Sequence, residues 1–281
     1  MRRESRTDLP VLLPFRLGSA PPASPTWRPC AWHGLLLAAA LTMAAMAAEA
    51  QAAPNVPSII ATLLKWTPLL AVGFLLNVAI SVIAMAIGTV FGTFLGLLQV
   101  SLLPPVRGFS WFVTQFFRNS PWLVLLFYCM LLLPFELRIG DAIVPLPAWL
   151  KATFGLALPV MANVSELVRG AVLSIPLGQW ESSEALAFSR RQTLWMIILP
   201  QCVKRMLPPW MNLYAILVVG TTLASVVGVN ESMTLTGDIL AAENRTELLV
   251  PLYLYLLLWF FAYCYPIARA TVALERRFQV R

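Results

Sequence analysis

Five apolar segments, separated by short polar stretches, follow one another between residue 65 and the C-terminus. Most approach the roughly 20 residues that a helix needs to cross a bilayer, and a helix satisfies its own backbone hydrogen bonds in lipid. The pattern predicts an all-α, polytopic membrane helix bundle with five core transmembrane helices. The segments cover about residues 69–98, 121–134, 154–172, 209–229 and 248–272, and the second is expected to begin near Phe116 because it is short when counted from Pro121.

The first core segment is long and carries three glycines spaced by four residues. Its length predicts a helix that tilts or projects past the bilayer. Gly88, Gly92 and Gly96 fall on one helical face, and small residues on one face allow a second helix to approach closely.

A different pattern occupies residues 1–53. A basic leader precedes an apolar stretch of about fifteen residues that ends near the letters "AEA" at 48–50, which is typical of a signal peptide. An uncleaved first helix is the alternative, and a true start further along is also open. Either way, residue 55 is expected on the outer side of the membrane.

Charge sets the orientation of the bundle. Only 12% of residues are charged against 59% hydrophobic, and the formal net charge is +7. The basic residues after residue 65 concentrate after the first and third core segments and at the C-terminus, whereas six of the ten acids in that part of the chain lie in the two intervening loops. Because basic residues favour cytoplasmic loops, the C-terminus and the loop 176–200 are predicted to be cytoplasmic. This distribution favours a membrane topology signal over nucleic-acid binding.

Catalytic and metal chemistry have little support. The only histidine is His33, in the leader, and the four cysteines form no CxxC pair. The sequence predicts no metal site, no cofactor, no disulfide and no catalytic residue. There is no G-x-x-x-x-G-K-[ST] motif, so a partner must bind ATP if ATP is used.

The loop 176–200 contains "GQWESSEALAFSRRQTLWMIILP" at 178–200. Ser189 and Gln192 fit a capping box for a helix that runs to about Leu199. Pro200 is expected to end or kink that helix. A second short helical piece precedes it at 181–188, so two short helices are expected to meet at Ser189. Such a loop could dock a soluble partner or simply lie on the bilayer.

The same stretch resembles the "EAA" loop of ABC-importer permeases, whose pattern is E-A-A-x3-G-x9-I-x-L-P. Glu181 takes the acidic position, and Ile197, Leu199 and Pro200 stand at the end of the pattern. Ser182 and Ser183 replace the two alanines and Ala187 replaces the glycine. These residues are also small, although Ala is less free in its backbone than Gly.

Further stretches resemble the polar-amino-acid branch of that family, and together they cover about residues 65–278. Val219 and Gly220 stand where that branch carries Lys and Asp. The matching stretches are "RNSPWLVLLF" at 118–127, "SELVRGAVLSIPLGQWE" at 165–181, "LPQCVKRMLPPWMN" at 199–212 and "VVGTTLASVVGVNE" at 218–231.

The resemblance implies an inner-membrane permease subunit of a bacterial importer that works by alternating access. It implies cytoplasmic ATP-binding subunits, a periplasmic solute-binding protein and a second permease copy, identical or related, as partners in the lipid membrane. The expected ATPase-coupling residues are Glu181, Ser182, Ser183, Leu186, Ala187, Phe188, Ser189 and Pro200. Candidate residues of the substrate pathway are Asn163, Glu166, Thr221, Thr222 and Ser225.

Several assignments stay open from sequence. Glu166 and Arg169 are expected to pair near the cytoplasmic end of the third core segment, with substrate contact as the alternative. A channel that needs no ATPase is the rival function, whereas an intramembrane enzyme lacks a suitable set of residues. The outer acids are candidates for docking the binding protein or ordinary solvated loop charges: Glu136, Asp141, Glu231 and Asp238.

Overall fold

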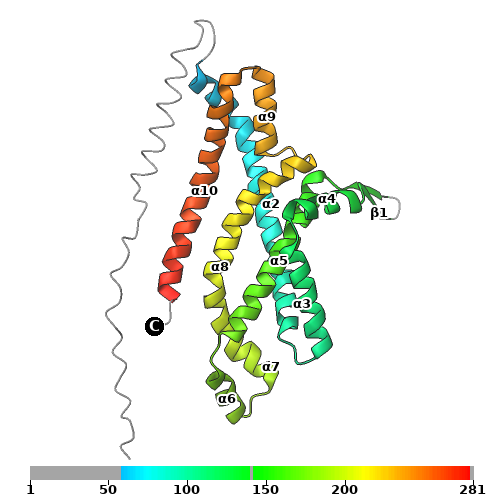
Figure 1. Ribbon diagram of the computed structural model, residues 1–281, viewed down its shortest axis with the longest axis vertical. Helices are drawn as coiled ribbons and strands as arrows, with labels where there is room; N and C mark the ends of the chain where they lie inside the picture. The colour runs from blue at the N-terminus through cyan, green and yellow to red at the C-terminus, as the bar shows by residue number, and fades with distance from the viewer. Residues whose placement is uncertain (1–57, 140–141, 279–281) are drawn as a thin grey trace, which may run out of the picture.

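The computed structural model describes residues 58–139 and 142–278, and it is an elongated bundle of helices (Figure 1). The signal-like segment and Asp141 lie outside these residues. Within them, four helical units are long and apolar enough to cross a membrane. They are α2 (Ile59–Gln99), α5 (Ala148–Leu173), the unit Arg190–Val227 that contains α8 (Leu199–Gly220), and the unit Thr246–Arg277 that contains α10 (Leu249–Phe278).

The predicted second span differs from a single helix. It consists of α3 (Pro104–Asn119) and the 11-residue α4 (Trp122–Leu132), which is too short to cross a bilayer alone. The chain breaks at Ser120, whose φ of −80° and ψ of 138° are extended, as expected before the ring of Pro121. The prediction of one helix starting near Phe116 was therefore wrong. Most of α3 lies in a stretch that we expected to be loop, because its polar and aromatic residues form no continuous apolar run.

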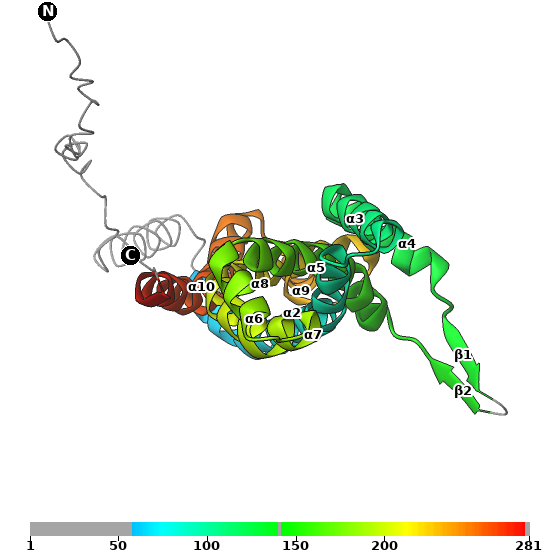
Figure 2. The same cartoon turned by 90° about the horizontal axis from the view of Figure 1, so that it is seen from below.

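A small hairpin interrupts the all-helical pattern. Strands β1 (Glu136–Ile139) and β2 (Ala142–Pro145) pair antiparallel and project sideways from the bundle (Figure 2). Just after these strands comes Lys151, which lies in a loop between the apolar segments predicted from sequence. In the structure this residue is fully buried in the first turn of α5. Its ammonium donates to the carbonyl of Leu133 at 3.0 Å and lies 3.6 Å from the centroid of the Phe135 ring.

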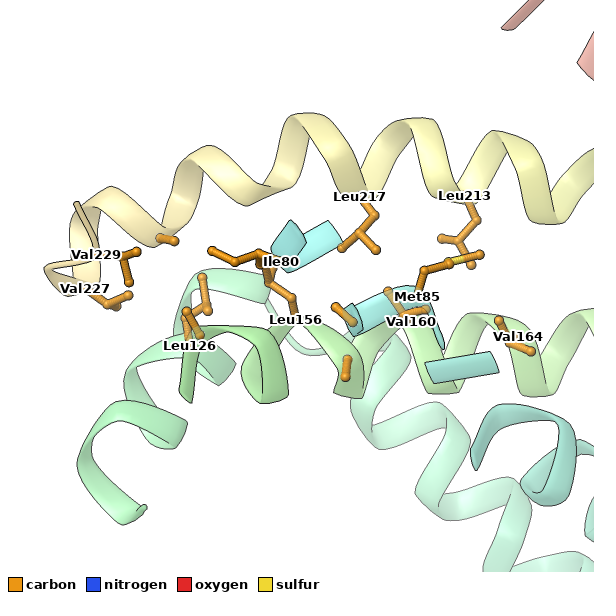
Figure 3. Close-up of a cluster of buried hydrophobic side chains, with 14 of the residues drawn as sticks. Ile80, Met85, Leu126, Leu156, Val160, Val164, Leu213, Leu217, Val227 and Val229 are labelled. Carbon is orange, nitrogen blue, oxygen red and sulfur yellow. The ribbon is translucent and has the colours of Figure 1, made fainter. Parts of the chain in front are cut away.

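Helix α5 lies at the centre of the packing and contacts α2, α3, α4 and α8. The largest buried cluster joins α2, α4, α5 and α8, with Leu156 and Val160 of α5 facing Leu213 and Leu217 of α8 (Figure 3). Ile80 from α2 completes this layer. Burial of these side chains against one another stabilises the contacts between the helix faces that point away from lipid.

The predicted glycine face of α2 is the surface that meets α5. A Cβ added at Gly92 would lie 2.5 Å from the backbone oxygen of Met161, and one at Gly96 would lie 2.6 Å from the Cβ of Val168. At Gly88 the added carbon would overlap the side chain of Val160. Any larger residue must therefore push the two helices apart, and the prediction of a close helix contact is confirmed.

A buried polar network fixes the end of the bundle where α9 (Ser232–Glu243) lies. The Glu231 carboxylate caps α9 by accepting from the backbone N–H groups of Met233 and Thr234 at 2.9 and 3.1 Å. The Asn77 amide of α2 donates to the same carboxylate at 2.8 Å and to the Thr221 hydroxyl at 3.0 Å. Glu231 is fully buried, so the expectation that it is a surface acid was wrong. Asp238, in the middle of α9, is exposed.

Figure 1 also gives the direction of each helix. The loop with α6 (Leu177–Ala185) and α7 (Arg190–Gln192), the start of α3 and the end of α10 lie towards one end of the bundle, and α9 lies at the opposite end. The loop 176–200 and the end of α10 therefore lie towards the same end, as the charge distribution predicts.

We predict that Gly92→Ala lowers the thermal unfolding temperature of the detergent-solubilised protein, because the new Cβ meets backbone that cannot move alone. Overpacking of this kind costs about 1–3 kcal/mol. Gly170→Ala is the matched control, since a Cβ there has no neighbour within 4 Å and both sites are helical. Equal unfolding temperatures for the two variants would contradict the close contact between α2 and α5.

A second prediction concerns pH and the end of α9. The Glu243 carboxylate accepts from Lys65 at 2.8 Å and from the Trp66 indole at 2.7 Å, and these bonds lower its pKa below the ordinary 4.5. A lowered folded-state pKa means that this stabilisation is complete above about pH 4.5 and is lost as the pH falls through the folded-state pKa. Glu243→Gln should therefore unfold more easily than the wild type at pH 6, with the difference shrinking towards pH 3.

The effect should be at most about 1 kcal/mol because the Lys65 side chain is 62% exposed. Asp238→Asn, which removes an exposed carboxylate of the same helix, is the control and should unfold like the wild type at pH 6. A gap between wild type and Glu243→Gln that widens at low pH would contradict this assignment.

Candidate functional site

The loop between α5 and α8 contains two short helices, as predicted, but the first covers 177–185 rather than 181–188, and a bend at 186–188 separates it from Ser189. Helix α6 ends at Ala185, and the Ser189 side chain caps α7. The Gln192 backbone N–H donates to Ser189 Oγ at 3.4 Å, and the Ser189 N–H donates to Gln192 Oε1 at 2.9 Å. The predicted capping box is confirmed.

Of the two outcomes expected at Pro200, an end or a kink of the helix, the first is wrong, because the helix continues past the proline. The chain forms a π-helical turn at Thr193–Ile198 and continues as α8 to Gly220, with Pro200 in the first turn of α8. A π turn is wider than an α turn, which gives the proline ring room against the preceding carbonyls. The second half of the loop, from Arg190 onward, and α8 are therefore parts of one helical unit of 38 residues, Arg190–Val227.

Ala187 occupies the bend where the family pattern has glycine. Its φ is 59°, which is the left-handed region that an L side chain adopts at a cost of about 1–2 kcal/mol. Two hydrogen bonds close the bend: Ala187 N–H donates to the Glu184 carbonyl at 2.9 Å, and Phe188 N–H donates to the Ser183 carbonyl at 3.0 Å. The replacement of glycine keeps the bend and adds strain to it.

The inner face of the loop is attached to the end of α5. Ile198 and Cys202 pack against Ala171, Val172 and Ile175 in a buried cluster. One turn after Cys202 in α8, the Arg205 guanidinium donates to the Ser174 carbonyl at 2.7 Å and to the Ser174 hydroxyl at 2.9 Å.

Burial divides the expected coupling residues into two groups. Glu181, Ser182 and Leu186 are exposed, and Leu186 keeps 71% of its surface accessible. Ser183 is buried and donates to the Gln179 carbonyl at 2.6 Å, while Phe188 is half-buried. The exposed group forms an outer face of α6, and the buried group holds its shape.

The predicted Glu166–Arg169 pair is present. Arg169 Nε donates to the two carboxylate oxygens of Glu166 at 2.7 and 3.1 Å, and its Nη2 donates at 2.8 Å. Arg118 of α3 approaches the same carboxylate at 3.8 Å. The carboxylate therefore joins α3 to α5 beside the loop.

The other candidate pathway residues lie apart from Glu166, along α5 and at the α9 end of α8. Thr222, Ser225 and Asn163 are half-buried, whereas Thr221 is fully buried. Each side chain donates to a carbonyl of its own helix: Asn163 to Pro159 at 2.8 Å, Thr221 to Val218 at 2.7 Å, Thr222 to Val219 at 2.9 Å and Ser225 to Thr222 at 2.7 Å.

Sequence reasoning missed the residues that hold the loop and the far end of the bundle. Asn77 is a polar residue inside an apolar span, which is a signal of an intramembrane contact that could have been used. Arg205 follows the loop, but its bond to Ser174 depends on how α5 and α8 meet and has no local signal.

Comparison with known proteins assigns the family. Residues 88–280 match the family described as binding-protein-dependent transport system inner membrane component. The chain belongs to this family. It is a multi-pass membrane component of a transport system, and the loop 176–200, α5, α8 and α10 all fall within the matched region.

Individual relatives agree with this assignment. The chain is 29% identical over 211 residues to the L-cystine transport system permease protein TcyB of Bacillus subtilis, covering 75% of this chain and 86% of the relative. It is 28% identical over 205 residues to the probable glutamine ABC transporter permease protein GlnP of the same organism, covering 73% and 91%. The fold is similar to that of a solved amino acid ABC transporter, with a TM-score of 0.66 and 22% identity over 76% of this chain and 96% of that one.

We predict that Ala187→Gly stabilises the protein by about 1 kcal/mol, because glycine adopts the left-handed region without a steric penalty. Ala185→Gly, two residues earlier in ordinary helix, is the control and should destabilise by a similar amount. Chemical denaturation of both variants in detergent measures this. Destabilisation by both would mean that the bend at Ala187 is not left-handed.

Proposed function

We propose that this chain is the permease subunit of an ATP-driven importer that carries polar amino acids or related small solutes across the bacterial inner membrane. The single observation that carries the proposal is the exposed face of α6, joined to a helix that crosses the bundle. The substrate class is supported by relatives whose names state cystine and glutamine transport.

The ATP-binding subunit would drive the bundle by moving α6 mechanically. A cytoplasmic ATP-binding subunit would receive the exposed residues Glu181, Ser182 and Leu186 in a cleft. Because Ser189 caps the start of the 38-residue helical unit, a displacement of α6 is passed to α8. Helix α8 packs on α5 through the central apolar cluster, so the two helices would shift as rigid bodies between inward-open and outward-open states.

The partners follow from this arrangement. ATP is hydrolysed by the ATP-binding subunits, and a periplasmic binding protein delivers the solute. A second permease, identical or related, completes the bundle. The loop 176–200 and the C-terminus face the cytoplasm, which agrees with the concentration of basic residues at that end.

We also propose roles for the candidate residues of the substrate pathway. Asn163, Thr222 and Ser225 keep part of their surface accessible, so they could contact solute where a second permease meets this one. Thr221 is fully buried beneath Asn77 and would act by holding the helix end. Glu166 is held by Arg169 and would shape the cytoplasmic mouth through this pair.

The rival function, a channel that needs no ATPase, gives the outer face of α6 no role. An exposed leucine and an exposed glutamate on a helix fixed from behind fit a protein partner better than open solvent. The two functions therefore differ in whether α6 binds an ATPase.

The test is capture of a cognate ATP-binding subunit by the purified permease, comparing wild type with Glu181→Lys and Leu186→Asp. Both variants should bind at least tenfold more weakly, because a desolvated leucine alone contributes about 1.5–3 kcal/mol. Glu275→Lys makes the same charge change on an exposed residue near the end of α10 and should bind like the wild type. Equal capture by all four proteins, with all four folded, would remove the coupling role and favour the channel.

A further inference from the structure

A cavity of about 780 Å³ lies beside the coupling loop, and α6 contributes Leu177, Trp180 and Glu184 to its lining. Its walls come from the end of α2, the start of α3, the end of α5 and the α6–α7 segment. These elements meet at the loop end of the bundle in Figure 1. Nothing in the proposed coupling or transport steps uses this cavity.

The charge of the cavity wall is positive. Arg107 of α3, Arg169 of α5 and Arg190 of α7 line it, against one acid, Glu184. Arg169 is neutralised by Glu166. Among the described residues Arg107 has no ion pair, and Arg190 lies over the Trp180 ring with its guanidinium carbon 5.6 Å from the centroid. Two guanidinium groups of the cavity wall, one from α3 and one from α7, thus remain available to an anion.

A buried amide on the same wall lacks a hydrogen-bond donor. Gln99 is 4% exposed and lines the cavity. Its Nε2 donates to Thr114 at 3.0 Å and to Ser165 at 2.7 Å, but its Oε1 has no partner. This acceptor is enclosed by protein atoms, so a ligand hydroxyl would reach it, and remove the free-energy cost of a buried acceptor without a partner, only after a small shift of the cavity wall.

The cavity opens onto an apolar surface. Leu102 and Trp111 line it and are 66% and 54% exposed, and Phe109 and Phe112 continue the apolar face of α3 at 70% and 61%. In Figure 2, α3 lies on the outside of the bundle. In a membrane this face meets acyl chains, and its aromatic residues suit the level of the headgroups.

We propose that this cavity binds an anionic phospholipid with a hydroxyl-bearing headgroup, such as phosphatidylglycerol, from the leaflet on the loop side. The phosphate lies between Arg107 and Arg190, a headgroup hydroxyl faces Gln99, and the acyl chains lie along α3. Basic pockets between transmembrane helices on the cytoplasmic side suit such headgroups. The bound lipid would tie α3 to the coupling loop.

Native mass spectrometry of the detergent-solubilised protein, titrated with phosphatidylglycerol or phosphatidylcholine, tests this. The first phosphatidylglycerol should bind more tightly than the first phosphatidylcholine. Arg107→Gln with Arg190→Gln should weaken phosphatidylglycerol binding by about 30-fold, since each arginine near a membrane contributes about fivefold. Lysine at both positions should retain most of the affinity.

The matched control is Arg276→Gln with Arg277→Gln, which removes two exposed arginines near the end of α10, outside the cavity. It should bind the lipid like the wild type. The single variant Arg107→Gln, at an exposed position, gives an independent reading and should show about a fivefold loss. Equal binding of the two lipids, equal losses in the two double variants, or displacement of the lipid by millimolar inorganic phosphate would each overturn the proposal.

Discussion

The close contact between α2 and α5 is the constraint on which the rest of this bundle depends. Lipid gives helices little hydrophobic reason to associate, so they must gain contact by approaching closely. Gly88, Gly92 and Gly96 allow that approach along one half of α2. Because α5 is held there, it can present its other faces to α3, α4 and α8 at the same time.

The proposed coupling role depends on how the loop 176–200 is joined to α8. Helix α6 buries Ser183 and packs Trp180 against the cluster around Ile198, and it leaves Glu181 and Leu186 exposed. The helix that follows passes Pro200 without a break because a π turn takes up the extra width. A rigid connection of this kind moves as one piece, whereas a flexible loop would absorb the displacement of a bound partner.

Much of this arrangement could be predicted from sequence. Long apolar runs gave the positions of α2, α5, α8 and α10, because lipid imposes a length and a composition on any spanning helix. The capping box at Ser189 and the Glu166–Arg169 pair also followed from spacing of three residues. These features are local, so a short stretch of sequence specifies them.

The features that failed depend on tertiary surroundings. Pro121 and Pro200 look alike as helix breakers, yet one separates α3 from α4 and the other sits inside a helical unit. Glu231 reads as a loop acid but is buried because Asn77, far away in sequence, reaches it. Lys151 likewise depends on a carbonyl and a ring supplied by the preceding segment.

The most direct test is uptake of labelled amino acids into proteoliposomes that contain this permease and its ATP-binding subunits, with the binding protein outside. The account predicts accumulation above the external concentration only when ATP is sealed inside and the binding protein is present. Equilibration of the label without ATP would contradict it, because that is the behaviour of a channel.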